Sequence, residues 1–243
     1  MTSQDATFAN RIALVTGASR GLGRAIALAL SDAGAHVIAC ARRRSALEDL
    51  DDEIHDRGGT ATLLQLDLTV GDKVDAIGPT LFERYQRLDV FVGNAAILGT
   101  LSPTNHVKSD DWDRVIATNL TANWRLIRTL DPLLRASEAG RALFVTAEQA
   151  RETPAYWAAY AASKSGLEGL VKTYAAEVQN STVRANLLMP SPMRTDLRKQ
   201  AYPGENPLLP TPPAEVAALA MRALEPTMTD NGRTFVFPND ASR

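Results

Sequence analysis

Short apolar runs alternate with longer stretches of helical periodicity along almost the whole chain. Continuous apolar runs of this kind are typical of strands that are covered on both faces of a sheet. They predict strands at residues 11–16, 36–40, 62–66, 89–92, 142–146, 183–189 and 234–237. The stretches between them, rich in Ala and Leu or charged on one side, predict helices at residues 22–33, 45–57, 70–85, 110–134, 156–178 and 214–224.

This alternation indicates a parallel sheet, because parallel strands need a helical crossover between them. We therefore predict an α/β fold: a single Rossmann-type domain with a doubly wound parallel sheet of about seven strands, flanked by helices. The domain is expected to span residues 11–243, after a flexible N-terminus at residues 1–10. The proline-rich stretch 190–213 is expected to form a loop with short helical pieces. In such a sheet the ligand lies at the carboxyl ends of the strands.

The net charge of −2 and the sequence pI of about 6.0 provide no basic field for nucleic acid or an anionic membrane. Residues 1–10 lack the apolar stretch of a signal peptide, and no run approaches the roughly 18 apolar residues of a membrane helix. We therefore expect a cytoplasmic protein. The single cysteine, Cys40, excludes an intramolecular disulfide. The spacing of His36, His55 and His106 predicts no metal site.

A glycine-rich turn, T-G-A-S-R-G-L-G, follows the first predicted strand and opens the first predicted helix. Glycines at this spacing let the backbone approach a pyrophosphate, whose negative charge the helix N-terminus favours. A glycine-rich stretch alone is equally typical of a flexible loop, but its place between a strand and a helix favours a nucleotide site. The residues expected to form that site are Gly17, Ser19, Arg20, Gly21, Leu22 and Gly23.

Four further motifs follow along the chain: Asn94-Ala95-Ala96, Asn119 in a long helix, Tyr160-Ala-Ala-Ser-Lys164, and P-S-P-M-R-T from Pro190 to Thr195. In their content and order, these motifs and the glycine turn resemble the short-chain dehydrogenase/reductase family. Ala96 and Ser191 stand where that family usually has glycine. The resemblance implies a nicotinamide dinucleotide cofactor that also contacts Asn94, Ala95, Ala96, Tyr160, Lys164, Pro190 and Thr195.

The residue at the end of the second strand decides between NAD and NADP, because it faces the adenosine ribose. By resemblance this position is Ala41, which lacks the acid that would repel a 2′-phosphate. Arg42 follows it, and Arg20 in the glycine turn is expected to approach the same phosphate. We therefore predict a preference for NADP(H) over NAD(H). Asp67-Leu68, after the third strand, resembles the pair that contacts the adenine, although Asp67 is equally suited to cap a helix.

The resemblance implies that Tyr160, Lys164 and Asn119 are the catalytic residues. Tyr160 and Lys164 are four residues apart and therefore share one helix face. The lysine ammonium and an oxidised nicotinamide are expected to lower the tyrosine pKa from its ordinary value of about 10. By resemblance, Tyr160 protonates a carbonyl oxygen during hydride transfer, Lys164 holds the nicotinamide ribose, and Asn119 supports a water relay to the lysine.

The family usually carries a serine thirteen residues before the tyrosine, and this chain has Ala147 there. Three alternatives stay open. Thr146 supplies the missing hydroxyl through a backbone shift; Glu148 or Gln149 has taken a different role; or catalysis is largely lost and the protein only binds nucleotide. The segments 155–157 and 193–209 fall where the family builds its substrate pocket and lid.

An isomerase or dehydratase on the same fold is a third functional class, which the compact length disfavours. We therefore expect an oxidoreductase that transfers hydride between a nicotinamide and a small carbonyl or alcohol substrate. By resemblance, the long helices 110–134 and 156–178 are expected to pair in a homodimer or homotetramer.

Overall fold

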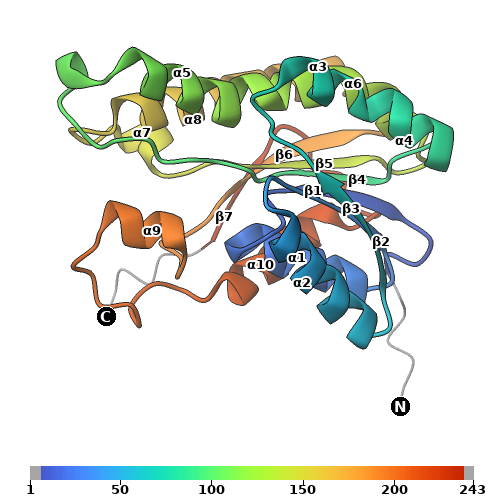
Figure 1. Ribbon diagram of the computed structural model, residues 1–243. Helices are drawn as coiled ribbons and strands as arrows, with labels where there is room; N and C mark the ends of the chain where they lie inside the picture. Colours follow the sequence, from blue (N-terminus) through green and yellow to red (C-terminus); the bar gives the residue numbers. More distant parts are fainter. Residues whose placement is uncertain (1–6, 238–243) are drawn as a thin grey trace.

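The computed structural model describes residues 7–237, which form a parallel sheet with the strand order β3-β2-β1-β4-β5-β6-β7 (Figure 1). This is the doubly wound sheet that the sequence predicted. Its direction of winding reverses between β1 and β4, so the crevice for a ligand is expected above those two strands. The strands are β1 (Ile12–Thr16), β2 (His36–Ala41), β3 (Thr60–Gln65), β4 (Val90–Gly93), β5 (Arg141–Val145), β6 (Arg184–Met189) and β7 (Thr234–Val236).

Helices cover both faces of the sheet (Figure 1). One layer consists of α1 (Gly21–Asp32), α2 (Arg44–Asp56) and α10 (Pro213–Leu224). The other contains α3 (Gly71–Asp75), α4 (Ile77–Tyr85), α5 (Ser109–Ile116), α6 (Ala122–Arg135) and α8 (Ala158–Glu177). Short helices η1 (Thr104–His106), α7 (Gln149–Glu152) and α9 (Asp196–Ala201) lie in the connections, and the short π-helical turn η2 (Ala117–Thr121) joins α5 directly to α6.

The strands are apolar throughout because each layer of helices buries one face of the sheet. On the side of α6 and α8 the core includes Phe91 and Phe144, whose rings meet edge to face with centroids 5.3 Å apart. On the other side Val37 and Val92 pack with Ile26. The two cores hold the carboxyl ends of the central strands at one edge, where the glycine turn also lies.

Two of the long predicted helices are interrupted. The helix expected at 70–85 divides at Ala76, because Pro79 has no N–H to donate to the carbonyl of Asp75. That carbonyl accepts from the Thr129 hydroxyl instead, at 2.8 Å. The helix expected at 110–134 contains a π-helical turn, η2, at the position of Asn119.

The start of the helix expected at 156–178 is also different. It begins at Ala158, because Tyr156 has a φ of +76° and cannot continue a helix. The proline-rich stretch forms a loop around α9, as expected.

The predicted flexible segment 1–10 lies largely outside the described residues. Of the remainder, Phe8 is buried in the core and its N–H donates to the carbonyl of Ala33 at 3.1 Å. Cys40 is also buried, and burial raises the pKa of its thiol to about 12. Within residues 7–237, no helix is both long and apolar enough to span a membrane, and no three His, Cys, Asp or Glu side chains are grouped to hold a metal. The cytoplasmic location stays a prediction.

Candidate active site

A cavity of about 680 Å³ opens at the carboxyl ends of the central strands. Its wall includes the glycine turn, the ends of β2 and β5, one side of α8 and all of α9 except Lys199. All the site residues that the sequence predicted line this cavity, except Gly23 and Asn119. Those two are buried immediately behind residues that do line it. Residues far apart in the sequence therefore meet around one space that is large enough for a dinucleotide and a small substrate.

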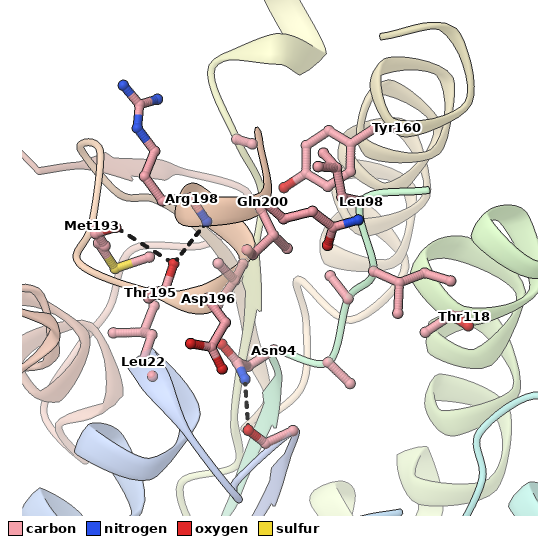
Figure 2. Close-up of a pocket in the computed structure, with 18 of the residues that line it drawn as sticks. Leu22, Asn94, Leu98, Thr118, Tyr160, Met193, Thr195, Asp196, Arg198 and Gln200 are labelled. Carbon is pink, nitrogen blue, oxygen red and sulfur yellow. Dashed lines mark hydrogen bonds between the residues drawn. The ribbon is translucent and has the colours of Figure 1, made fainter. Parts of the chain in front are cut away.

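The glycine turn is closely packed against the end of β4. Gly17 and Gly21 have φ angles of +66° and +57°, which favour glycine. A Cβ on Gly23 would lie 2.4 Å from both the Gly17 carbonyl oxygen and Asn94 Nδ2, so no larger residue fits. Asn94 Nδ2 also donates to the Thr16 carbonyl at 2.9 Å and to the Gly17 carbonyl at 3.4 Å, and the second of these bonds is the one drawn in Figure 2. The turn presents its backbone and the start of α1 to the cavity, which fits a pyrophosphate group.

Thr16 joins the two strands at the point where the sheet reverses direction. Its hydroxyl donates to the Val92 carbonyl at 3.1 Å and accepts from the N–H groups of Asn94 and Ala95 at 3.0 and 3.1 Å. The side chain is buried. This bonding fixes the Asn94-Ala95 segment beside the glycine turn, so both motifs face the same cavity.

The end of β2 forms another part of the wall. Ala41 is buried and lines the cavity, and the neighbouring Arg42 is exposed at its rim. Arg20 pairs with Asp196 of α9, with 2.6 Å between Nη1 and Oδ2. The adenosine side of the cavity therefore presents two guanidinium groups and no carboxylate at position 41, which is compatible with a phosphate on the ribose.

Asp67 does not cap a helix, the alternative that the sequence offered beside an adenine contact, because α3 begins at Gly71 with Val70 as its N-cap; it closes a local turn instead. Its Oδ1 accepts from the Thr69 N–H at 2.9 Å and from the Thr69 hydroxyl at 2.8 Å. These bonds, led by the backbone N–H, hold the pKa of Asp67 below its ordinary value. Both Asp67 and Leu68 line the cavity, and their contact with an adenine stays a prediction.

Tyr160 and Lys164 lie on the first turns of α8, and both side chains are buried at the cavity wall. Lys164 Nζ donates to the carbonyl of Val145, at the end of β5, at 2.7 Å. The same ammonium is 5.8 Å from the centroid of the Tyr160 ring. The helix thus places a proton donor and a cation side by side, as the four-residue spacing predicted.

Burial shifts the pKa of both groups away from their charged forms. It raises the pKa of Tyr160 and lowers that of Lys164 to about 8. In the protein without cofactor the pKa of Tyr160 therefore lies above its ordinary value, and its lowering by Lys164 together with an oxidised nicotinamide stays a prediction. The pKa is raised because desolvation of the phenol is the dominant effect. Tyr160 consequently stays protonated at neutral pH, ready to donate its proton.

Asn119 holds α8 in place from behind. Its Nδ2 donates to the Ile97 carbonyl at 2.9 Å and to Ser163 Oγ at 3.0 Å, while its Oδ1 accepts from the Ile97 N–H at 2.9 Å. Ser163 Oγ in turn donates to the Tyr160 carbonyl at 2.7 Å. Asn119 is fully buried and does not line the cavity, so its contacts give it a positioning role. The water relay stays a prediction. Sequence reasoning did not single out Ser163, although it lies inside the Tyr160–Lys164 motif.

Thr146 lines the cavity, but its hydroxyl is bonded to another side chain, and its role as the missing hydroxyl stays one of the open alternatives. Its Oγ1 is buried and donates to Glu168 Oε1 at 3.0 Å, on α8. Ala147, the next residue, belongs instead to a small apolar cluster with Leu98, Trp157, Tyr160 and Ala161. Successive side chains of extended backbone point to opposite sides, which explains why only one of the two reaches Tyr160. Glu148 and Gln149 line the cavity.

The short helix α9 closes the cavity above Tyr160. Its Leu197 and Ala201 pack against the apolar cluster around Tyr160. Tyr202, which follows the helix, lies 5.9 Å from the Trp157 ring. Its own ring is covered by the Arg198 guanidinium at 3.7 Å. The sequence placed a lid at 193–209, but no motif marked these individual contacts or Gln200, which also lines the cavity.

The family model described as short chain dehydrogenase matches residues 11–206. The chain belongs to this family. It is 33% identical to the oxidoreductase YciK of Escherichia coli K12 over 213 residues, 86% of this chain and 84% of the relative. A short chain dehydrogenase from Pseudomonas syringae superimposes with a TM-score of 0.92 at 32% identity, covering 97% of both chains. One from E. coli CFT073, solved in complex with NADPH, gives a TM-score of 0.90 at 32% identity and covers 97% of this chain and 99% of that one.

These likenesses confirm the family and fold that the motifs predicted. This short-chain dehydrogenase is therefore an oxidoreductase with a small-molecule substrate, rather than a nucleotide-binding protein that has lost its activity.

Proposed function

We propose that this short-chain dehydrogenase reduces a carbonyl compound to an alcohol with NADPH. The observation that carries the proposal is the buried Tyr160–Lys164 pair, which lines the same cavity as Ala41 and Arg42. One end of the cavity thus suits proton donation, and the other suits a phosphorylated adenosine ribose. The NADPH complex of the E. coli CFT073 relative supports this choice of cofactor.

The glycine turn, the start of α1 and Asn94 with its neighbours would hold the dinucleotide. NADPH, when bound, supplies the hydride that the carbonyl carbon accepts. The Tyr160 hydroxyl donates its proton to the carbonyl oxygen, so that the C=O group becomes CH–OH. Lys164 places its ammonium beside the tyrosinate that remains and stabilises it until a proton returns from solvent.

The direction of this proton transfer agrees with the electrostatics of the site. Burial raises the pKa of Tyr160, which keeps the phenol protonated before the reaction. Reduction starts from the protonated phenol, whereas oxidation of an alcohol starts from tyrosinate. A raised pKa also makes the phenol a weaker acid, so transfer of its proton depends on Lys164 and the bound cofactor to stabilise the tyrosinate.

Apolar groups around Tyr160 favour a substrate with a hydrophobic portion next to its carbonyl. Leu98, Trp157 and Ala147 surround the tyrosine, and Leu197 closes the space from α9. Burying such a substrate excludes water from the carbonyl and strengthens the hydrogen bond from Tyr160.

Self-association through the α6 and α8 side of the molecule is the second part of the proposal. Trp112 on α5 and Trp124 on α6 are 38% and 44% exposed, which is unusual for such large apolar side chains. A dimer or tetramer would cover them. Light scattering of the purified protein tests this part; a monomer at micromolar concentration would contradict it.

The decisive experiment titrates the protein with NADPH and NADH and then measures turnover with a panel of ketones and aldehydes. We expect tighter binding of NADPH and a turnover that Tyr160→Phe abolishes while NADPH still binds. Tyr156→Phe is the matched control, since Tyr156 is 59% exposed and should leave turnover unchanged. NADPH binding without turnover on a broad panel would contradict the reductase proposal, and tighter binding of NADH would contradict the choice of cofactor.

A further inference from the structure

A carbonyl oxygen that receives a proton from Tyr160 has room for a second hydrogen bond, because it carries two lone pairs. A second donor stabilises the negative charge that develops on this oxygen during hydride transfer. The side chain that follows β5 on the Tyr160 side is Ala147, which has no donor. The second bond must therefore come from another group on the cavity wall.

Most polar side chains on this wall are already bonded elsewhere. The Thr146 hydroxyl donates to Glu168, and the Asn94 amide donates to Thr16 and Gly17. The Lys164 ammonium donates to Val145 and, in the proposed reaction, stabilises the tyrosinate. Ser191 is bonded to Thr211, with 3.1 Å between their hydroxyl oxygens. Glu148 lines the cavity, but its ionised carboxylate accepts hydrogen bonds and would repel a developing oxyanion.

Two amides on the wall, Gln149 and Gln200, make no side-chain hydrogen bond within residues 7–237, and Gln200 is the one carried by the helix that packs over Tyr160. It lies three residues after Leu197 and one before Ala201, both of which pack against the cluster that contains Tyr160. Its amide makes no hydrogen bond within residues 7–237 and lines the cavity. Figure 2 shows the Gln200 side chain directed into the cavity toward the region of the Tyr160 hydroxyl, whereas Thr118 lies well apart on another wall.

We propose that the Gln200 amide donates the second hydrogen bond to the substrate's carbonyl oxygen, opposite the Tyr160 hydroxyl. This inference rests on the proposed reductase function and adds a substrate-orienting residue to it. Because Gln200 is carried by α9, the donor joins the site only when the lid helix packs over Tyr160. Orientation of the substrate and closure of the lid are then one event.

The test compares Gln200→Leu with wild type in NADPH-dependent reduction of the best carbonyl from the panel. Loss of a donor to a developing oxyanion lowers turnover by roughly 10²–10³-fold in a rigid site. Since Gln200 lies on an exposed helix, we expect a fall in kcat/KM of about tenfold to a hundredfold, mostly in kcat. The Kd for NADPH should change less than about twofold. Lys199→Leu, at the exposed neighbouring position on α9, is the matched control and should leave both quantities unchanged.

Rescue separates a missing donor from a damaged lid. Ala147→Ser places a hydroxyl beside Tyr160 from the strand side, so it should restore most of the kcat lost in Gln200→Leu. If Gln200→Leu had instead damaged the lid, a hydroxyl at position 147, just after β5, would not restore kcat. Wild-type kcat in Gln200→Leu, or no rescue by Ala147→Ser, would overturn the assignment. A loss of kcat in Gln149→Leu but not in Gln200→Leu would overturn the assignment of Gln200 and would indicate Gln149 as the second donor.

The two proposals fail in different ways. If the reductase function is wrong, wild type shows no turnover that depends on Tyr160. If only the role of Gln200 is wrong, wild type turns over, Tyr160→Phe does not, and Gln200→Leu behaves as wild type.

Discussion

Arg20 Nη1 lies 2.6 Å from Asp196 Oδ2, an ion pair that links the glycine turn directly to the lid helix α9. Both side chains are well exposed, at 61% and 69%, so the pair contributes little to stability. The pair lies where the cofactor is proposed to bind, so it is expected to affect cofactor affinity rather than stability. In Figure 2 the Asp196 carboxylate points toward the strand end that carries Asn94, where the dinucleotide is proposed to lie. An anionic cofactor therefore competes with Asp196 for Arg20.

Removing the negative charge of Asp196 should tighten NADPH binding. Asp196→Asn frees Arg20 and removes a carboxylate from the path of the cofactor phosphates. An exposed ion pair contributes roughly 0.2–1 kcal/mol, which corresponds to a gain in affinity of up to about fivefold. The gain should shrink as salt is added, because exposed charges are screened. Fluorescence titrations at two ionic strengths measure it.

Glu83→Gln provides a matched control for this titration. It makes the same change of net charge on the exposed face of α4, which does not line the cavity. Weaker NADPH binding in Asp196→Asn would contradict the competition and would indicate that the carboxylate itself contacts the cofactor.

Arg42 should decide which dinucleotide the protein prefers. A charge-assisted hydrogen bond contributes about 1.5–3 kcal/mol, so Arg42→Ala is expected to weaken NADPH binding by roughly tenfold to a hundredfold. NADH has no 2′-phosphate, and its Kd should change less than about twofold. Arg43→Ala is the control, since Arg43 is also exposed but does not line the cavity. Equal losses for both cofactors in Arg42→Ala would refute its role as a phosphate ligand.

Local patterns in the sequence were sufficient to predict the sheet and much of the site. The glycine turn and the Tyr160–Lys164 pair are local, because their spacing within one turn or one helix fixes their geometry. The π-helical turn at Asn119 was not predictable, since it depends on bonds to Ile97 and Ser163 from other segments. Leu197 also packs against the cluster that contains Tyr160, although the two residues lie in different segments and no hydrophobic periodicity relates them.

The same limit applies to Thr146, whose hydrogen bond to Glu168 no sequence motif predicted. From the sequence, its hydroxyl was a candidate for the substrate contact because it precedes Ala147. Its partner in the structure is a buried carboxylate 22 residues later, Glu168, which binds that hydroxyl across the interface of β5 and α8. Such a pairing depends on how a helix packs over a strand, and no local spacing encodes it.

Thr146→Val should therefore impair stability and leave catalysis intact. It removes the hydroxyl from the buried Glu168 carboxylate, whose remaining partners are Arg151 and Lys172 at 3.5 and 3.4 Å. Leaving a buried acceptor without its donor costs about 1–3 kcal/mol of unfolding free energy. Denaturant unfolding measures this loss, while kcat should stay within about twofold of wild type.

Thr80→Val is the control for Thr146→Val. It removes a hydroxyl that donates to the Ala76 carbonyl on the exposed side of α4, where water replaces the bond. Unchanged stability in Thr146→Val together with a kcat reduced more than tenfold would restore the threonine as a substrate contact.

The buried ammonium of Lys164 should make stability depend on pH in a defined window. Its pKa is lowered from an ordinary value of 10.5 to about 8, with burial as the cause. Below about pH 8 the lysine is charged in both the folded and unfolded protein, so folding carries the full cost of burying it. Above about pH 10.5 it is neutral in both states, and the cost vanishes. Between these two pH values the unfolded state binds more protons than the folded state. The contribution of Lys164 to the free energy of unfolding therefore becomes more favourable as the pH rises.

Lys164→Met isolates this effect, because the other titrating groups are common to both proteins. At pH 7.5 the charged lysine costs wild type about 3 kcal/mol, from the 1.36 kcal/mol that one pKa unit represents. The difference in unfolding free energy between wild type and Lys164→Met should therefore shift by about 2 kcal/mol in favour of wild type from pH 7.5 to pH 10, as measured by urea unfolding at each pH. Lys73→Met, at an exposed lysine of α3, should show a difference from wild type that stays constant with pH. A constant difference for Lys164→Met as well would mean that the lysine keeps its ordinary pKa. That outcome would refute the lowering of the Lys164 pKa by burial.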